Sequence, residues 1–470
     1  MQIVKNELAQ SPHKIPDIHF YTDAYELAQD LPKYDADLIF LDECQAPKDD
    51  LQRTVSFENL KFALEKFSPN QFHYTMGRVI VVLPEEQQKT QRAFELGLAN
   101  VRAVVTPFPN SGNLISSAVD QLRNFHQNHN KISLCFSGGG IEGYIYSLGV
   151  SRALDSCFAN SACQNFDIFS GVSSGAILAS AYAAQATSDD LVKQLFRKHP
   201  HLKNIQLSTL FDPATGELAK RAFGFFRAFS SFNSSKNIKH LQDAVPVGLF
   251  RGEKLRYFLE HQINALGARD DFSALTKELY VSATDQDTGE NVVFGEEPWR
   301  DVKISQAVRA STALPFFYLP EKINGHWFTD GQLTGNSDFN LAISKGAGLV
   351  VYIDPVVAYT SNMPGEAIRR GGYFTVLQAI KSLAQSRATA LLKHAMDSNP
   401  DVDFVIFRPI DLGMEAMAGN PMKYQIRTEL MNLGFQCTIA QILSAYDVFA
   451  HRFAKHGVTL KQKAEILHIT

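Results

Sequence analysis

Residues 166–184, FDIFSGVSSGAILASAYAA, contain the turn from which both the fold and the chemistry of this chain can be read. An apolar, strand-like run ends at Gly171, and an alanine-rich helical stretch follows Gly175. A G-x-S-x-G pattern between a strand and a helix is typical of a nucleophile elbow, where a sharp turn exposes a serine. The flanking glycines permit the close backbone approach that such a turn needs. Ser173 is therefore the candidate nucleophile, and a plain Gly/Ser turn before a helix is the alternative.

Three consecutive glycines, Gly138, Gly139 and Gly140, lie upstream in residues 132–150, ISLCFSGGGIEGYIYSLGV. They follow a strand-like run and precede a helical one, so their amides can point together at one anion. A phosphate-binding P-loop would need a lysine after its last glycine, and none stands there. The spacing also fits a dinucleotide-binding G-x-G-x-x-G, but the next strand ends in the serine elbow rather than in the required acidic residue. An oxyanion hole beside a serine is the better interpretation.

Residues 323–336, INGHWFTDGQLTGN, offer a base for the serine, because a strand-like stretch ends there in Asp330-Gly331. A serine hydroxyl is a weak nucleophile and needs a group that accepts its proton. A buried aspartate at the end of a strand could do this without a histidine. A Ser-His-Asp triad remains the alternative. Its candidate histidines are one at the expected start of a strand and three expected on helix surfaces: His326, His394, His451 and His456.

The order of these motifs resembles the patatin-like phospholipases. That family carries a G-G-G-x-[KR]-G loop, a G-x-S-x-G elbow and a D-G-[GA] segment, which stand here as GGGIEG, GVSSG and DGQ. Residues 281–294, 304–320 and 346–356 resemble the family's intermediate strands, its Ala-Ser-x-x-x-Pro segment and its late strand. The resemblance covers residues 132–409, and several motifs in the right order are far more specific than one.

The resemblance implies a lipid acyl hydrolase of the phospholipase A or lysophospholipase type. Ser173 would be the nucleophile and Asp330 the general base of a Ser-Asp dyad. The amides of the three glycines would form the oxyanion hole, and the reaction would use no metal or other cofactor.

Two residues depart from the family pattern. Glu142 stands where the family has Lys or Arg, so a cation near the oxyanion loop is missing, and Gln332 replaces a small residue after Asp-Gly. These departures favour the second hypothesis, a catalytically weakened interaction or scaffold protein. The intact serine, aspartate and glycine triplet favour an enzyme.

The N-terminal segment alternates strand-like and helical stretches, which predicts a parallel sheet covered by helices. It weakly resembles response-regulator receiver domains: DLIFLDE would end in the phosphoacceptor Asp42, but Thr106 occupies the lysine position before Pro107. Phosphoryl transfer needs Mg²⁺ held by several carboxylates and a compensating cation. We therefore expect a receiver-like domain that is not phosphorylated and serves interaction or dimerisation. An unrelated α/β domain is the alternative.

The predicted fold class is α/β, with a receiver-like (flavodoxin-like) domain, a patatin-like hydrolase domain and a helical C-terminal extension. We expect these parts at residues 1–127, 131–410 and 411–470, with the polar stretch HQNHNK as the linker between the first two. The net charge of −4 over 470 residues offers no field for nucleic acid. Five scattered cysteines indicate free thiols in a reducing compartment, and their spacing suits no structural zinc.

A phenylalanine-rich stretch with basic residues, KRAFGFFRAFSSF at residues 220–232, lies between the elbow and Asp330. Aromatic and basic side chains together suit the surface of a membrane, which predicts lipid contact through Phe225, Phe226 and Phe229. A helix packed on the core is the alternative. We expect a cytoplasmic protein that associates peripherally with membranes and forms a homodimer, and export by a signal not evident in the sequence stays open.

Overall fold

The computed structural model describes most of the chain. The described residues are 19, 21, 24–42, 57–67, 72–83, 96–105, 111–210, 212–219, 247–335, 339–358, 364–409 and 424–469. The phenylalanine-rich stretch at residues 220–232, with Phe225, Phe226 and Phe229, lies outside them, as do Thr106 and Pro107.

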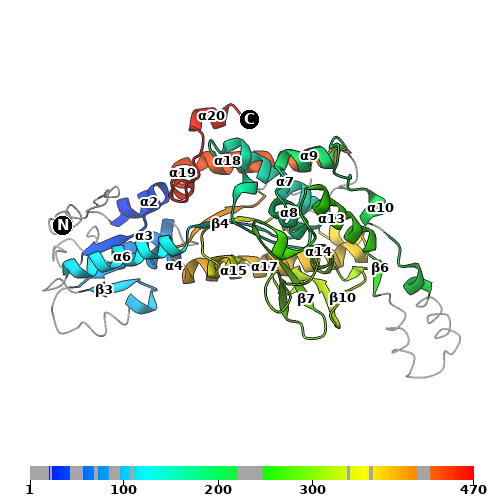
Figure 1. The fold of residues 1–470 in the computed structure, drawn as a ribbon. Helices are drawn as coiled ribbons and strands as arrows, with labels where there is room; N and C mark the ends of the chain where they lie inside the picture. Colours follow the sequence, from blue (N-terminus) through cyan, green and yellow to red (C-terminus); the bar gives the residue numbers. More distant parts are fainter. Residues whose placement is uncertain are drawn as a thin grey trace, which may run out of the picture.

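An eight-stranded mixed sheet forms the centre of the molecule (Figure 1). Its strand order is β10-β11-β7-β5-β4-β12-β13, with β8 paired to β7. The strands β7, β5, β4, β12 and β13 run parallel, while β8, β10 and β11 add antiparallel pairs. The strands are β4 (Lys131–Phe136), β5 (Ile168–Val172), β7 (Glu278–Asp285), β8 (Asn291–Phe294), β10 (Glu321–Ile323), β11 (His326–Asp330), β12 (Ala347–Ile353) and β13 (Asp403–Phe407). Every residue of β5 and β12 is buried, as expected of parallel strands covered on both faces.

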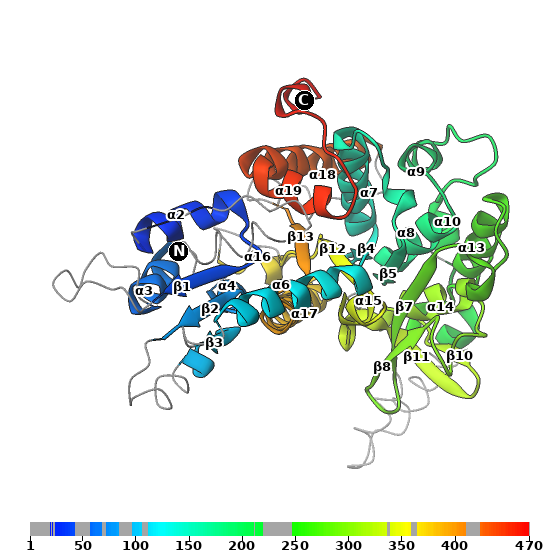
Figure 2. The same ribbon diagram turned by 60° about the vertical axis from the view of Figure 1, so that its left-hand side comes forward.

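Helices cover the two faces of this sheet, so that the molecule has three layers (Figure 2). Along β4, Leu134 and Phe136 contribute to one apolar core, whereas Cys135 between them contributes to the other. The first core is covered by α7 (Gly140–Cys157), α8 (Ser174–Ala183), α9 (Ser188–Leu195), α13 (Glu253–Ala265), α14 (Ile304–Ser311), α18 (Tyr424–Ser444) and α19 (Tyr446–Lys455). The second is covered by α6 (Ser111–Asn128), α15 (Phe339–Ser344) and α17 (Gly372–Ser398).

Short elements complete this part of the chain. They are η3 (Cys163–Asn165), α10 (Leu207–Leu210), η4 (Phe272–Ala274), η5 (Gly331–Leu333), α16 (Glu366–Arg369), α20 (Lys463–Leu467) and the two-stranded sheet of β6 (Gly248–Phe250) and β9 (Phe316–Tyr318). The segment η5 directly follows Asp330 and therefore shapes the surroundings of the predicted base.

Helix α18 is built into the core rather than added to its surface. A Cβ atom on Gly149 of α7 would collide with the carbonyl oxygen of Met431, and one on Gly434 of α18 would collide with that of Tyr146. The two backbones approach this closely only because glycine stands at both contact points. The segment expected as a C-terminal extension therefore belongs to the same hydrophobic core as the sheet.

A smaller parallel sheet, β1 (Ile39–Asp42), β2 (Val79–Val82) and β3 (Ala103–Val105), forms the N-terminal unit. Its described helices are α2 (Ala24–Tyr34), α3 (Phe57–Phe67) and α4 (Phe72–Met76). Asp42 ends β1, as the sequence pattern predicted. Three parallel strands fit both a receiver domain and another α/β unit, so the receiver resemblance stays a prediction. The linker predicted at residues 126–131 is shorter in the structure, because α6 continues through Asn128 and β4 begins at Lys131.

Ion pairs join the N-terminal unit to β13, the last strand of the main sheet, and to helix α19. Asp35 accepts hydrogen bonds from Arg452 Nε at 2.6 Å and Nη2 at 2.8 Å, and from Arg78 Nη1 at 3.2 Å. Lys455 bridges Asp37 on this unit and Asp403 at the start of β13, at 2.5 and 2.9 Å. Burial by itself would raise the pKa of Asp35, but Arg452 and Arg78 outweigh it and lower that pKa. The cations therefore keep these buried carboxylates ionised.

The described part of the chain contains no helix that is long and apolar enough to span a bilayer. Its cysteines, Cys135, Cys157, Cys163 and Cys437, are buried free thiols, while Cys44 lies outside the described residues. Within the same residues, no group of three or more His, Cys, Asp or Glu side chains could hold a metal ion.

Candidate active site

The predicted elbow is a strained turn between β5 and α8. Ser173 has φ 53° and ψ −127°, a conformation that residues with a side chain rarely adopt and that is common at functional turns. Glycine is required on both sides of it. A Cβ on Gly171 would lie 2.5 Å from the carbonyl oxygen of Gly175, and one on Gly175 would lie 2.5 Å from that of Phe136. The turn thus holds Ser173 at the carboxyl end of β5, where parallel sheets bind their ligands.

A hydrogen-bonded serine from α14 holds this turn from the other side. The backbone N–H of Ser173 donates to Ser311 Oγ at 2.8 Å, and Ser311 Oγ donates to the carbonyl oxygen of Ser282 on β7 at 2.6 Å. Ser311 lies in the Ala-Ser-x-x-x-Pro segment, which the sequence singled out without giving this serine a role. Its hydroxyl satisfies both buried backbone groups and so supports the strained conformation at Ser173.

The structure brings Ser173 and Asp330 together. Ser173 Oγ donates to Asp330 Oδ2 at 2.7 Å, and the backbone N–H of Gln332 donates to Asp330 Oδ1 at 2.9 Å. The Asp330 side chain is buried, with 1% of its residue surface exposed. Burial raises the pKa of Asp330 to about 6, although the two hydrogen bonds oppose that shift. A carboxylate with this pKa is ionised at pH 7 and is a stronger base than an exposed aspartate.

The glycine triplet forms the loop between β4 and α7, next to Ser173. Gly139 and Gly140 have φ 122° and 68°, which glycine adopts without strain. A Cβ on Gly138 would lie 3.0 Å from Ser173 Cβ, so the loop and the nucleophile are in contact. Within the described residues, the amides of Gly138, Gly139 and Gly140 donate to no protein acceptor. They are donors available to an anion at the start of α7, where the helix dipole adds positive potential.

The four histidines of the triad alternative lie elsewhere. His326, at the start of β11, pairs with Asp285 at 2.8 Å, and His394 is exposed on α17. His451 lies 3.8 Å from Asp37. The expected surface position of His456 is wrong: its side chain is buried and pairs with Asp403 at 3.1 Å, because α19 packs against β13. In the described part of the chain, the Asp330 carboxylate accepts hydrogen bonds from the Ser173 hydroxyl and a backbone amide, and from no imidazole.

The two departures from the family pattern both lie beside the glycine loop. Glu142 is in the first turn of α7, and burial raises the pKa of its carboxyl group, while a hydrogen bond from its own backbone N–H and the charge of Lys381 of α17 oppose the shift. The side-chain amide of Gln332 lies over Gly138: a Cβ there would be 2.9 Å from Gln332 Cδ.

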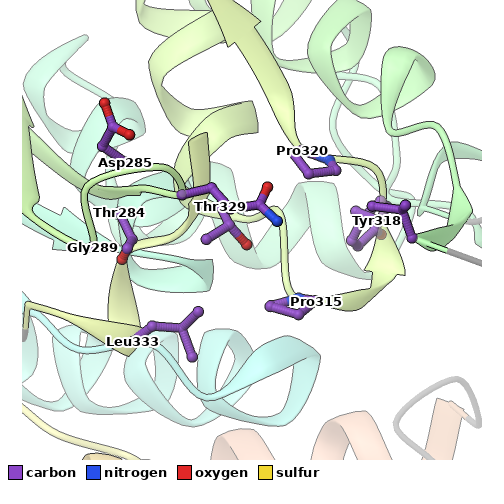
Figure 3. A pocket seen from close by; sticks show the side chains of 10 residues that line it. Thr284, Asp285, Gly289, Pro315, Tyr318, Pro320, Thr329 and Leu333 are labelled. Atoms are coloured by element: carbon purple, nitrogen blue, oxygen red, sulfur yellow. The ribbon is translucent and has the colours of Figure 1, made fainter. Parts of the chain in front are cut away.

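A cavity of about 220 Å³ lies beside β11, the strand that ends in Asp330, and Thr329 of that strand lines it (Figure 3). Thr284, Thr329 and Leu333 line it, but neither Ser173 nor Asp330 does. The Thr284 hydroxyl donates to the carbonyl oxygen of Asp330 at 2.9 Å, so this cavity abuts the backbone of the base rather than its carboxylate.

Comparisons with known proteins agree with the motifs. Residues 134–343 match the family model for patatin-like phospholipases. An uncharacterized protein, R571, of Acanthamoeba polyphaga mimivirus is 26% identical over 212 residues, which is 44% of this chain and 60% of that protein. The probable lipid hydrolase 463L of Invertebrate iridescent virus 6 is 24% identical over 212 residues, 45% of this chain and 63% of that protein. The chain thus spans about six-tenths of these curated relatives.

The crystal structure of VipD from Legionella pneumophila aligns with a TM-score of 0.32 and 18% identity, over 67% of each chain. That likeness is too weak to support an inference about fold or function. The match over residues 134–343, which are similar to the patatin-like phospholipases, nevertheless supports a hydrolase.

Proposed function

We propose that the hydrolase domain releases fatty acids from membrane lipids, as a phospholipase A or lysophospholipase, through a Ser173–Asp330 dyad. The observation that carries the proposal is the 2.7 Å hydrogen bond from Ser173 Oγ to the buried Asp330 carboxylate. The family match and the similarity to the probable lipid hydrolase 463L of the iridescent virus support a lipid ester as substrate.

In the first half of the reaction, Asp330 accepts the proton of Ser173 as Oγ attacks the carbonyl carbon of the ester. The carbonyl oxygen becomes an oxyanion and accepts hydrogen bonds from the glycine-loop amides. When the tetrahedral intermediate collapses, the bond to the lipid alcohol breaks, and Asp330 returns its proton to the departing alkoxide oxygen. An acyl-enzyme on Ser173 remains.

In the second half, water attacks the acyl carbon and gives a proton to Asp330. The acyl-oxygen bond to Ser173 then breaks, and Asp330 returns the proton to the serine oxygen. The fatty acid leaves, and both side chains regain their starting states. One carboxylate thus moves every proton, which requires a pKa close to the working pH.

The test is fatty-acid release from vesicles of mixed phospholipid and lysophospholipid. Ser173→Ala and Asp330→Asn should each lower the rate by about 10³-fold or more, since the two groups act as a unit. Ser174→Ala is the matched control, because Ser174 is the neighbouring buried serine and its hydroxyl has no partner among the described residues. It should keep most of the activity. Equal rates for wild type and Ser173→Ala would instead favour a scaffold protein.

Contact with the membrane through the phenylalanine-rich stretch is part of the same proposal. Replacing Phe225 and Phe226 with Ser should reduce binding to anionic vesicles while sparing hydrolysis of a water-soluble ester. Equal loss on vesicles and on the soluble ester would make these residues part of the folded core. The proposed cellular site is accordingly the cytoplasmic surface of a membrane.

For the N-terminal unit we propose a receiver-like interaction module that is not phosphorylated and through which the protein dimerises. Its support is the sequence resemblance, with a parallel sheet and Asp42 at the end of β1. Sedimentation of the whole chain, with and without a small-molecule phosphodonor, tests it. A monomer in both conditions would contradict dimerisation. A change of oligomeric state on addition of the phosphodonor would contradict a module that is not phosphorylated.

A further inference from the structure

The side chain of Gln332 fills space directly beside the nucleophile. The position that a Cβ on Gly138 would take lies 2.9 Å from Gln332 Cδ and 3.0 Å from Ser173 Cβ, and Gln332 Oε1 lies nearer still. The side-chain amide of Gln332 and the side chain of Ser173 therefore lie on either side of the same space next to Gly138. Ser173 itself is 8% exposed. An ester carbonyl held between Ser173 Oγ and the glycine loop would therefore lie beside this amide.

The backbone at Gln332 is fixed, so only its side chain can move. Its N–H donates to Asp330 Oδ1 at 2.9 Å, and the carbonyl oxygen of the next residue, Leu333, accepts a hydrogen bond from Arg387 of α17. A Cβ on the preceding Gly331 would lie 2.6 Å from the backbone of Ser282, which leaves no room for a shift toward β7. The space beside Ser173 and Gly138 thus depends on the size and rotamer of one side chain.

A restricted space beside the nucleophile discriminates between esters by the branching of the substrate close to the ester bond. In a two-chain glycerophospholipid, the carbon next to the ester-bearing carbon carries a second acyl ester. In a lysophospholipid it carries only a hydroxyl group. A side chain that takes space beside the reacting carbonyl excludes the first more strongly than the second. Even one added or missing methylene group in an apolar pocket changes discrimination by about 10- to 200-fold.

We propose that Gln332 is a specificity-determining residue that restricts the site to single-chain lipid esters such as lysophospholipids. This inference rests on the proposed lipid hydrolysis. Gln332 departs from the D-G-[GA] pattern. In this proposal the departure narrows the space beside Ser173 and does not indicate a loss of catalytic activity.

The experiment compares kcat/KM for lysophosphatidylcholine and phosphatidylcholine of the same acyl chain in identical mixed micelles. Wild type should prefer the one-chain lipid. Gln332→Gly should raise the relative rate on the two-chain lipid by about tenfold or more, because it removes the obstruction. Gln332→Met, of similar length without the amide, should keep the wild-type preference. If the glycine variant is unfolded by circular dichroism, Gln332→Ala takes its place.

Three results would overturn the inference. The ratio of the two rates could stay the same in wild type and Gln332→Gly. Both Gln332→Gly and Gln332→Met could lose kcat on both lipids alike, which would make the amide an oxyanion donor. Gln332→Met could lose the preference as fully as Gln332→Gly, which would make hydrogen bonding the cause. A wild-type chain active on neither lipid would overturn the proposed function itself, so the two failures are distinguishable.

The contact can also be tested without a lipid. Gly138→Ala places a methyl group against both Gln332 and Ser173, and it should lower the Tm of the wild-type chain. In a Gln332→Gly background the same substitution should lower the Tm less, because only the 3.0 Å contact with Ser173 remains. Equal losses in the two backgrounds would show that the amide does not lie there.

Discussion

Replacing the buried base Asp330 with Asn should stabilise the protein near neutral pH. Burial raises the pKa of this carboxyl group to about 6 in the folded chain, whereas in the unfolded chain it returns to about 4. The ionised form is therefore less favourable in the folded state. Well below the unfolded pKa the group is protonated in both states and stability is unaffected. Stability is lost as the pH rises from the unfolded pKa to the folded pKa, and the loss levels off above the folded pKa.

The size of the effect follows from the shift of about two pKa units. Each unit corresponds to about 1.4 kcal/mol, so ionised Asp330 should destabilise the fold by about 3 kcal/mol at pH 7 and by about half a kcal/mol at pH 4. Asparagine preserves the shape and can still accept the hydrogen bond from the Gln332 backbone N–H. The variant should accordingly gain nearly all of this difference at neutral pH.

The assay is urea unfolding of wild type and Asp330→Asn at several pH values between 4 and 8. Other groups titrate over this range, but they are common to both proteins and cancel in the difference. The gap between the two free energies of unfolding should widen with pH and level off above about pH 7. A gap that is constant with pH, or a variant less stable than wild type at pH 7, would refute the assignment of a raised pKa to Asp330.

Three further predictions concern the same chain. The kcat/KM for ester hydrolysis should fall about tenfold per pH unit below pH 6, as Asp330 takes up a proton, and a pH profile that is flat down to pH 5 would contradict its role as base. Ser311→Ala should lower the free energy of unfolding in urea by about 1–3 kcal/mol and should also lower kcat, because the backbone N–H of Ser173 loses its acceptor. A loss of stability with unchanged kcat would show that Ser311 stabilises the fold without supporting catalysis. Arg452→Ala should cost about 3–5 kcal/mol in the same measurement by leaving Asp35 buried with less compensation, and an unchanged unfolding curve would rule out that pair as an anchor.

The sequence was most informative where a residue type is required by local backbone geometry. The elbow and the glycine loop each need glycine at fixed spacings within a few residues, so the motif and the geometry coincide. The approach of Asp330 to Ser173, 157 residues apart, was implied by the family resemblance and could not be derived from either segment alone.

What the sequence did not predict depends on packing between distant segments. Ser311 reaches the elbow because of how α14 sits against β7, and Gln332 covers Gly138 because of the turn at η5. Neither position follows from periodicity or composition. The predicted surface position of His456 was wrong for the same reason. The amphipathic pattern of α19 does not reveal that the end of this helix packs against Asp403, the first residue of β13.

The pairing of Asp35 with Arg452 also constrains when the molecule can be completed during synthesis. The two residues are 417 positions apart, so at 5–20 residues per second the ribosome needs roughly 20–80 s to deliver the arginine after the aspartate. Until then, among the described residues, Arg78 of the same unit is the cation that pairs with Asp35. The serine elbow at residues 171–175 is therefore synthesised well before Arg452, which joins Asp35 to the carbonyl oxygen of Phe404 on β13.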